Sequence, residues 1–263
     1  MDAMKYIATL VILTAGLLFL TQLTAQDVPS TVAAAHFKPN AGRLKMGTFT
    51  YRDLDHGNEV GKDSLTIRKL TNSERYDFSS DSTFAADFSG FRSQRWEAVA
   101  TPTFEPISAM LAFVRGSEIV PVFDLRYRSS RVTGFVIERK GTAPGTRRSV
   151  DASVPGNTVD QRIDWAAVLA ADLETGRQFE FNVYDPGTGV SHVTGRVGPL
   201  EQVEVPAGTF RAYRILYQMN KTGVIEHYQM HASQDSPHVM LREEFPNGVI
   251  TELVRVIEPA GLP

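Results

Sequence analysis

The sequence predicts an all-β protein, a single antiparallel β barrel or sandwich with one short helix near residues 160–173. Three observations support this fold class. Segments rich in Thr, Val, Ile, Tyr and Phe alternate apolar with polar residues, as strands with one buried face do. Clusters of Asp, Asn, Gly and Pro interrupt these segments roughly every ten residues, a spacing typical of sandwiches and barrels rather than βαβ units. A chain of 263 residues is long enough for one such domain.

Strands and turns follow one another through the first half of the chain. We expect strands over 43–54, 59–70 and 75–88, separated by polar turns. The segment 120–140 is expected to form a hairpin about its two central serines. Apolar and charged residues alternate along its first arm, which predicts one buried face and one face in water.

A change of composition marks the middle of the chain. The segment 141–158 is rich in Gly, Pro, Ser and Thr, and we expect a long surface loop there. The helix near 160–173 follows, with Asp160 placed to cap its start and Gly176 placed at its end. This helix either divides two β halves or plugs the end of a single curved sheet.

The run VEVPAGTFRAY, residues 203–213, predicts how two later strands meet. Pro206 has no amide hydrogen to donate to a sheet, so the strand over 202–205 ends there or lies at an edge. Gly208 tolerates the positive φ that a tight turn requires. Residues 209–217 are therefore expected to pair back as the next strand.

The same run resembles the pattern V-x-V-P-A-G-T-F-x-A-Y of exported bacterial proteins grouped as domain-of-unknown-function family 3108. Segments 163–185 and 241–248 are also similar to that family, and the resemblance covers about residues 44–257. Segment 231–241 departs from the family, because it lacks the Trp-containing strand often found nearby. The resemblance implies an antiparallel β barrel or sandwich in the cell envelope, and it implies no activity.

The N-terminus has the three-part pattern of a secretory signal. Lys5 precedes an apolar run over 7–20, which is short for a bilayer span, and a small residue stands at the cleavage point. We expect a signal peptide over 1–25, with an uncleaved anchor as the alternative, then a linker over 26–43 and one β-rich domain over 44–258. The mature protein is then periplasmic or secreted and has no transmembrane span.

Composition excludes several classes of protein. The chain has no cysteine, which excludes a disulfide-linked scaffold, a thiol enzyme, a lipoprotein acylated on cysteine and a Cys-ligated zinc site. Its net charge of −3 gives no reason to expect a nucleic-acid partner. Nucleophile and phosphate-binding motifs are also missing from the sequence, and no cofactor is expected.

Two groups of residues are candidates for a site. The first is a basic row that would bind an anion or a glycan, or would simply form the wet face of a strand: Arg126, Tyr127, Arg128 and Arg131. The second is a pair of histidines flanking a turn, His231 and His238, which approach one another if a hairpin forms. They are the only metal candidates, and we expect ordinary surface histidines and no metal.

Two functions remain open from the sequence. The first is a non-catalytic envelope protein that binds a lipid or another apolar or amphipathic molecule, or an envelope protein, in a barrel mouth or concave sheet. The second is an envelope polysaccharide hydrolase or lyase whose catalytic residues come from separate strands. An apolar cavity would favour binding, whereas a polar groove that holds His with Asp or Tyr would favour catalysis.

Overall fold

A computed structural model of the protein describes residues 37–88, 91–138 and 145–258. The expected signal peptide, residues 1–25, and most of the expected linker lie outside the described residues. The described part of the chain forms one sheet of 15 strands with one short α-helix, which confirms the all-β prediction. Because all strands belong to one continuous sheet, the protein is a curled single sheet rather than a sandwich of two.

The first half of the described chain contributes eight strands: β1 (Gly47–Asp55), β2 (Asn58–Lys69), β3 (Tyr76–Phe88), β4 (Phe91–Ala100), β5 (Pro106–Arg115), β6 (Glu118–Arg128), β7 (Arg131–Glu138) and β8 (Thr146–Ser153). The second half contributes seven: β9 (Thr158–Asp160), β10 (Gln178–Asp185), β11 (Gly189–Val205), β12 (Gly208–Lys221), β13 (Val224–Ser233), β14 (Met240–Glu244) and β15 (Ile250–Ile257). The described helices are η2 (Ala41–Arg43) and η3 (Gln161–Ile163), both 3₁₀, and α1 (Asp164–Leu169).

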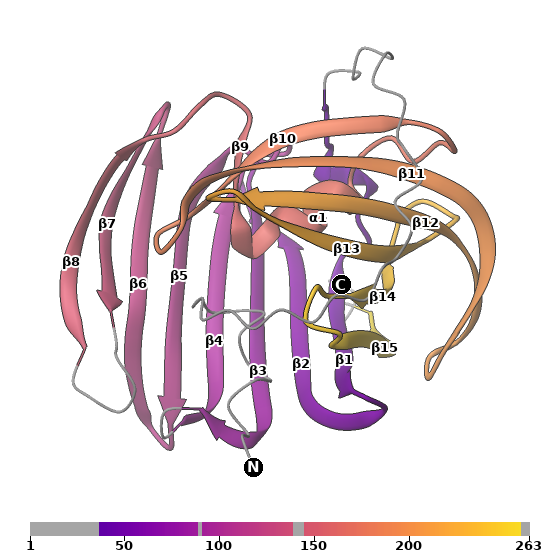
Figure 1. Ribbon diagram of the computed structural model, residues 1–263, viewed down its shortest axis with the longest axis horizontal. Coiled ribbons are helices and arrows are strands. Elements are labelled where there is room, and N and C mark those ends of the chain that lie inside the picture. The colour runs from indigo at the N-terminus through magenta and orange to yellow at the C-terminus, as the bar shows by residue number, and fades with distance from the viewer. Residues whose placement is uncertain (1–36, 89–90, 139–144, 259–263) are drawn as a thin grey trace.

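The strand order shows two meanders joined at their ends. It runs β8-β7-β6-β5-β4-β3-β2-β1-β15-β14-β13-β12-β11-β10-β9. Neighbouring strands are antiparallel, except that β9 runs parallel to β10. The first meander forms a wall of upright strands, and strands of the second cross over it (Figure 1). At the end of the second meander, β9 and η3 pack against β5 and β4 of the first.

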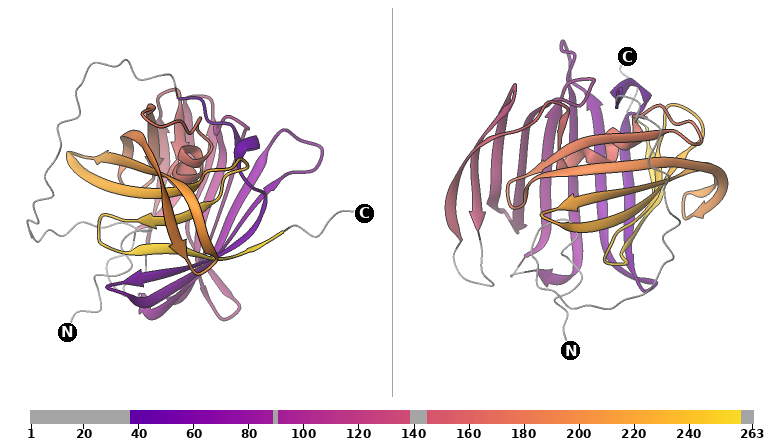
Figure 2. Two further views of the ribbon diagram at one scale, coloured as in Figure 1. Left: turned by 90° about the vertical axis from the view of Figure 1, so that its right-hand side faces the viewer. Right: turned by 45° about the horizontal axis from the view of Figure 1, so that its top comes forward.

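Helix α1 lies between the two meanders, as both views in Figure 2 show. Four of its residues are fully buried or nearly so: Ala166, Ala167, Val168 and Leu169. Of the two roles open from the sequence, this position fits a plug inside a single curved sheet.

Period-two alternation directs side chains to the inside of this sheet. In β1, Phe49 and Tyr51 are buried, whereas the neighbouring Thr48 and Thr50 keep part of their surface. In β4 the buried positions include Trp96 and Ala98, again with one residue between them. The inner face therefore supplies a continuous apolar core, as a chain without disulfides requires.

The hairpin expected at 203–213 is present. Strand β11 ends at Val205, which pairs with Gly208 at the start of β12, and Gly208 has a φ of 136°. A bulge farther along β11 shifts the register between Val197 and Leu200. Gly198 lies in that bulge, where a Cβ atom would be 2.7 Å from the carbonyl oxygen of Arg214. Such bulges increase strand curvature, and β11 and β12 are visibly curved in Figure 1.

The helix is shorter than the predicted 160–173. Asp160 acts as expected, since its side chain accepts a hydrogen bond from the Arg162 amide at the start of η3. The α-helix ends at Leu169, and the next carbonyl, that of Ala170, accepts from the amide of Asn40 and from Arg43. The Ala170 carbonyl is therefore already hydrogen-bonded to the N-terminal segment, whereas a helix longer by one turn would use it for an intrahelical hydrogen bond.

The prediction of a surface loop over 141–158 was wrong for most of the residues that the structure describes there. Residues 146–153 form edge strand β8, and β9 begins at residue 158. Strand β8 pairs along all of β7, and Val150 is buried in the core. Charged side chains on the two strands form ion pairs, such as Arg131 with Asp151. The polar composition of this segment is therefore compatible with a strand.

Residues 37–43 of the expected linker pack against the domain. The ring of Phe37 stacks on that of Phe181, with 4.4 Å between centroids. Ala41 in η2 is fully buried. None of the helices in the described part of the chain is long and apolar enough to cross a membrane.

Candidate functional site

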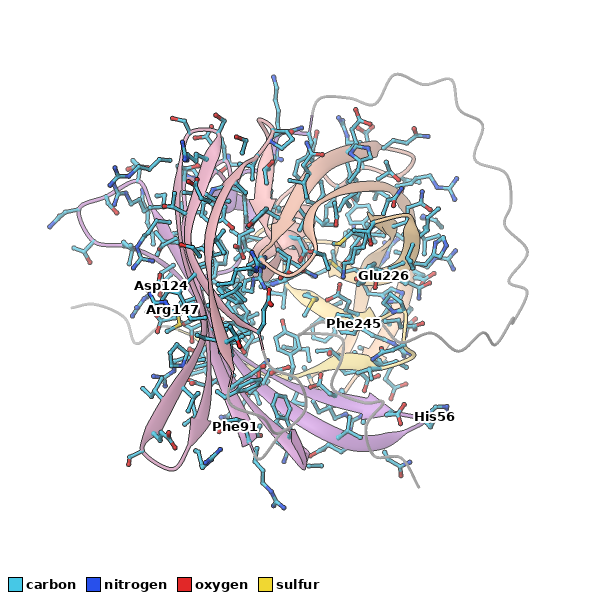
Figure 3. All side chains as sticks on the ribbon, turned by 60° about the vertical axis from the view of Figure 1, so that its left-hand side comes forward. His56, Phe91, Asp124, Arg147, Glu226 and Phe245 are labelled. Atoms are coloured by element: carbon cyan, nitrogen blue, oxygen red, sulfur yellow. The ribbon has the colours of Figure 1, made fainter. Side chains whose placement is uncertain are left out.

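A cavity of about 160 Å³ lies inside the curled sheet, beside η3 and α1. Much of its wall is aromatic, with rings from six elements: Tyr51, Phe84, Trp96, Trp165, Tyr217 and Tyr228, joined by Phe245 just after β14. Figure 3 shows Phe245 between the two halves of the molecule. Tyr217 and Tyr228 stack with 4.9 Å between ring centroids. The cavity is partly open, so a small molecule has a route into it.

Two aspartates on neighbouring strands share a hydrogen bond at this cavity. Asp63 on β2 donates to Asp53 on β1 and accepts from Ser82. The hydroxyl of Thr251 donates a hydrogen bond of 2.5 Å to Asp53 Oδ1. Burial, and next the charge of Asp53, raise the pKa of Asp63 to about 8. Burial also raises the pKa of Asp53, so the pair holds one proton between its two carboxyls near neutral pH.

A second acidic pair faces the cavity from α1 and β14. Glu243 is buried and accepts a hydrogen bond from the hydroxyl of Tyr217. Burial raises the pKa of Glu243 to about 8, and the charge of Asp164 raises it further in the same direction. Burial also raises the pKa of Asp164 to about 7. Trp165 fixes the geometry beside it, because its amide donates to Asp164 Oδ1 at 2.7 Å and its indole donates to the Arg162 carbonyl at 3.0 Å.

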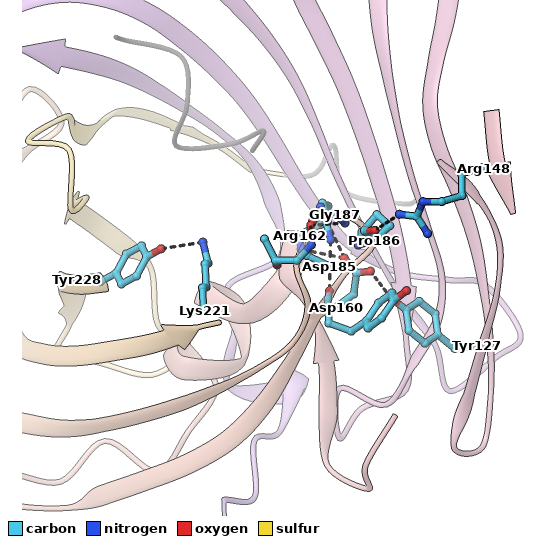
Figure 4. A network of polar contacts seen from close by, with 11 residues as sticks. Tyr127, Arg148, Asp160, Arg162, Asp185, Pro186, Gly187, Lys221 and Tyr228 are labelled. Atoms are coloured by element: carbon cyan, nitrogen blue, oxygen red, sulfur yellow. Dashed lines mark hydrogen bonds and ion pairs between the residues drawn. The ribbon is translucent and has the colours of Figure 1, made fainter. Parts of the chain in front are cut away.

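Arg162 is the positively charged residue in the cavity wall, and its charge is already matched. Its guanidinium donates to Asp160 at 2.7 Å and to Asp185 at 2.9 Å, and all three side chains are buried. Asp160 also accepts from the hydroxyl of Tyr127 at 2.5 Å. Figure 4 shows this network, which links β6, β9, η3 and β10. It holds the helical segment in place against the sheet.

Gln94 is a buried polar group that the described residues leave partly unsatisfied. Its side chain lies in the cavity wall and the residue is 2 % exposed. No described residue accepts a hydrogen bond from its Nε2. A buried donor without a partner costs about 1–3 kcal/mol, so this position has a hydrogen bond to offer to a molecule in the cavity.

The predicted basic row is divided between the two faces of the sheet. Arg126, Arg128 and Arg131 are exposed, and Tyr127 is buried with its hydroxyl on Asp160. Arg126 pairs with Asp124 and Arg131 with Asp151. Asp124 lies on the outer side of the wall, away from the cavity (Figure 3). The structure therefore does not bring Tyr127 to the arginines, and anion binding by the arginines stays a prediction.

The two histidines have separate partners. His231 Nε2 is 2.7 Å from Glu201 Oε1, and His238 Nδ1 donates to the carbonyl of Ser233 at 2.8 Å. Both residues are buried rather than at the surface. In the described ranges, no three His, Asp or Glu side chains are grouped as a metal site.

Sequence analysis did not identify the acidic residues of the cavity, although strand alternation carries a signal for them. Adjacent residues of a strand point to opposite faces of the sheet, and Glu243 and Glu244 follow this rule. Glu243 indeed lies at the cavity, whereas Glu244 pairs with Arg242. The signal for Asp53 and Asp63 was present as well, because each occupies an inward position in register with apolar residues such as Tyr51 and Leu65.

Comparison with known proteins supports the family resemblance. The profile of a family described as "Protein of unknown function (DUF3108)" matches residues 43–254. No curated protein is similar enough in sequence to match.

Three solved structures are similar to this chain at low sequence identity. A crystal structure of a β-barrel-like protein of domain-of-unknown-function family 1849 from Brucella abortus has a TM-score of 0.52 and 10% identity, covering 83% of this chain and 100% of that one. A protein from Bacteroides fragilis described as exported, with a YmcC-like fold, has a TM-score of 0.38 and 11% identity, covering 84% of this chain and 100% of that one. A protein from Parabacteroides distasonis described as a lipoprotein has a TM-score of 0.37 and 13% identity, covering 86% and 100%. The first likeness shows a β-barrel-like fold and nothing about activity.

Proposed function

This chain belongs to the DUF3108 family of proteins of unknown function, and we propose that it is an exported protein that binds a small amphipathic molecule inside its curled sheet. The cavity carries this proposal. Apolar and aromatic walls with a few convergent polar groups are typical of small-molecule sites, and this cavity combines seven aromatic side chains with buried carboxyls. The secretory pattern over residues 1–25 supports export to the periplasm or beyond.

The size of the cavity limits what it holds. A cavity of roughly 150 Å³ accepts a molecule such as benzene, and this one measures about 160 Å³. The ligand is therefore a small molecule, or one end of a longer amphiphile whose remainder extends through the open side.

The proposal predicts that the protein carries a ligand when it is purified gently from the periplasm. Native mass spectrometry of the whole exported protein should show an adduct of low mass. Val60→Phe, which fills part of the cavity, should lose it. Val190→Phe makes the same change at an exposed position and should keep it. An unmodified mass for the wild-type protein, together with no affinity for apolar probes, would remove the proposal.

An acid–base hydrolase is the second candidate, and the proton-sharing pair Asp53 and Asp63 favours it. Two carboxyls that share one proton can supply an acid and a base together. This candidate requires turnover of a polysaccharide or smaller glycoside that Asp63→Asn abolishes. The test is to incubate a panel of envelope polysaccharides with the wild-type protein and with Asp63→Asn. Turnover by the wild type alone would favour the hydrolase over the binding function.

A further inference from the structure

Resting on the proposed binding function, we propose that the polar end of the ligand is a cationic amine, held by carboxyl groups and aromatic rings of the cavity. Four acidic side chains from four elements line this cavity: Asp53 from β1, Asp63 from β2, Asp164 from α1 and Glu243 from β14. None of them forms an ion pair within the described ranges of the chain. An ionised carboxyl among them is therefore left for a cationic ligand to match.

The cations near the cavity are occupied elsewhere. Arg162 is held by Asp160 and Asp185, at 2.7 and 2.9 Å. Lys221 has its Nζ 2.7 Å from Glu226 and 3.5 Å from the hydroxyl of Tyr228 (Figure 4). The charges of both cations lower the pKa of Asp164, but neither cation forms an ion pair with any of the four acids.

The aromatic wall is suited to the same kind of ligand. A cation is attracted to the face of Trp, Tyr or Phe within about 6 Å of the ring, and surrounding rings form the cages that bind amines. Trp96, Trp165 and Tyr217 belong to this wall, on β4, α1 and β12. The acids and the rings thus line the same small space.

Gln94 gives an independent indication that the cavity takes a ligand. Its buried Nε2 lacks an acceptor among the described residues. An acceptor atom on a bound molecule, such as a hydroxyl or ether oxygen, would complete its hydrogen bonding. An amine that also carries such an oxygen matches both features of the wall.

Binding of an amine should be linked to protons. Asp63, Asp164 and Glu243 have raised pKa values, so a bound cation favours their ionised forms and promotes proton release. The other charged or titratable groups that act on the acids are the tyrosines Tyr51, Tyr217 and Tyr228, the cations Arg162 and Lys221, and Asp160. Burial holds the tyrosine pKa values above their ordinary range, so the tyrosines stay neutral. Amine affinity should consequently rise from pH 6 to pH 8.5.

The test compares three probes of matched size and different charge. 2-Phenylethylamine, 2-phenylethanol and phenylacetate are titrated calorimetrically into the exported protein at pH 6 and pH 8.5. The amine stays charged in this range, since alkylamines such as the lysine side chain titrate near ~10.4. We expect the amine to bind at least tenfold more tightly than the alcohol at pH 8.5, the alcohol to be indifferent to pH, and phenylacetate to bind least.

Amide variants assign the preference to the acids. Glu243→Gln and Asp63→Asn keep side-chain shape and hydrogen bonding, and each should reduce the amine preference at least threefold while alcohol binding is retained. Asp151→Asn on the outer edge strand is the matched control and should leave it unchanged. Equal binding of amine and alcohol would overturn the inference while leaving the binding function in place. Binding of no probe would overturn both.

Discussion

At the scale of single residues, buried carboxyl groups make part of the inner face of the sheet acidic. Ordinary aspartates and glutamates ionise near pH ~4, whereas Asp63 and Glu243 have pKa values raised by burial to about 8. Their hydrogen bonds come from Ser82 and Tyr217, and not from any cation. Such groups act as acids or as ion-pair partners only when something enters the cavity.

These carboxyls predict an unusual dependence of stability on pH. Between about pH 4 and pH 8 the folded chain retains protons that the unfolded chain loses, so the free energy of unfolding should fall as pH rises. Each group contributes at most about 1.4 kcal/mol per pH unit. Urea denaturation at pH 5, 6.5 and 8 should show this decline, and Glu243→Gln should make it shallower. Stability that is flat or increasing over this range in the ligand-free wild type would contradict the assignment.

Single residues also show what the sequence could and could not predict. Alternation along β14 is enough to place Glu243 at the cavity and Glu244 on the other face. It could not bring Asp53 to Thr251, because their contact joins positions 198 residues apart. That contact requires β1 to pair with β15, a closure that no local pattern encodes.

At the scale of elements, the buried network around Arg162 positions the helical segment that forms one side of the cavity. Arg162 in η3 contacts acids at the end of β9 and of β10, and its guanidinium lies 4.6 Å from the ring centroid of Phe123 on β6. Removal of one partner from a buried ion pair leaves an uncompensated charge. The network is thus the attachment between α1 and the sheet.

Arg162→Met should therefore destabilise the protein by about 3–5 kcal/mol. Arg131→Met is the control, since Arg131 makes its ion pair with Asp151 at the exposed sheet edge and its loss should leave stability near wild type. Denaturant midpoints of the two variants provide the comparison. Similar midpoints would show that the buried network does not hold the helix.

Strands and turns were predicted well where apolar and polar residues alternate regularly, and poorly where a polar composition suggested a loop. The hairpin at Pro206 and Gly208 followed from backbone chemistry alone. Strand β8 was mistaken for a loop, because its exposed face is Arg, Asp and Ser and only Val150 marks the buried side. The helix was predicted too long, since contacts of Ala170 with Asn40 and Arg43 cannot be inferred from spacing.

At the scale of the whole molecule, the described part of the chain is one sheet that encloses a cavity by curling, with its two meanders joined through β1 and β15. The sequence predicted the class of this fold, but the alternative of two packed sheets stayed open. The choice depends on which strands pair across the middle, and the bulge at Gly198 helps to bend the second meander over the first.

The central claim, that a small amphipathic molecule enters this cavity, has a direct optical test. The chain contains two tryptophans, Trp96 and Trp165, and both line the cavity, so all indole emission comes from its wall. Titration with 2-phenylethylamine should change the intensity or wavelength of this emission until it saturates, and should fail to do so in Val60→Phe. Emission that stays unchanged in the wild type up to the highest soluble concentration of the probe would contradict the claim.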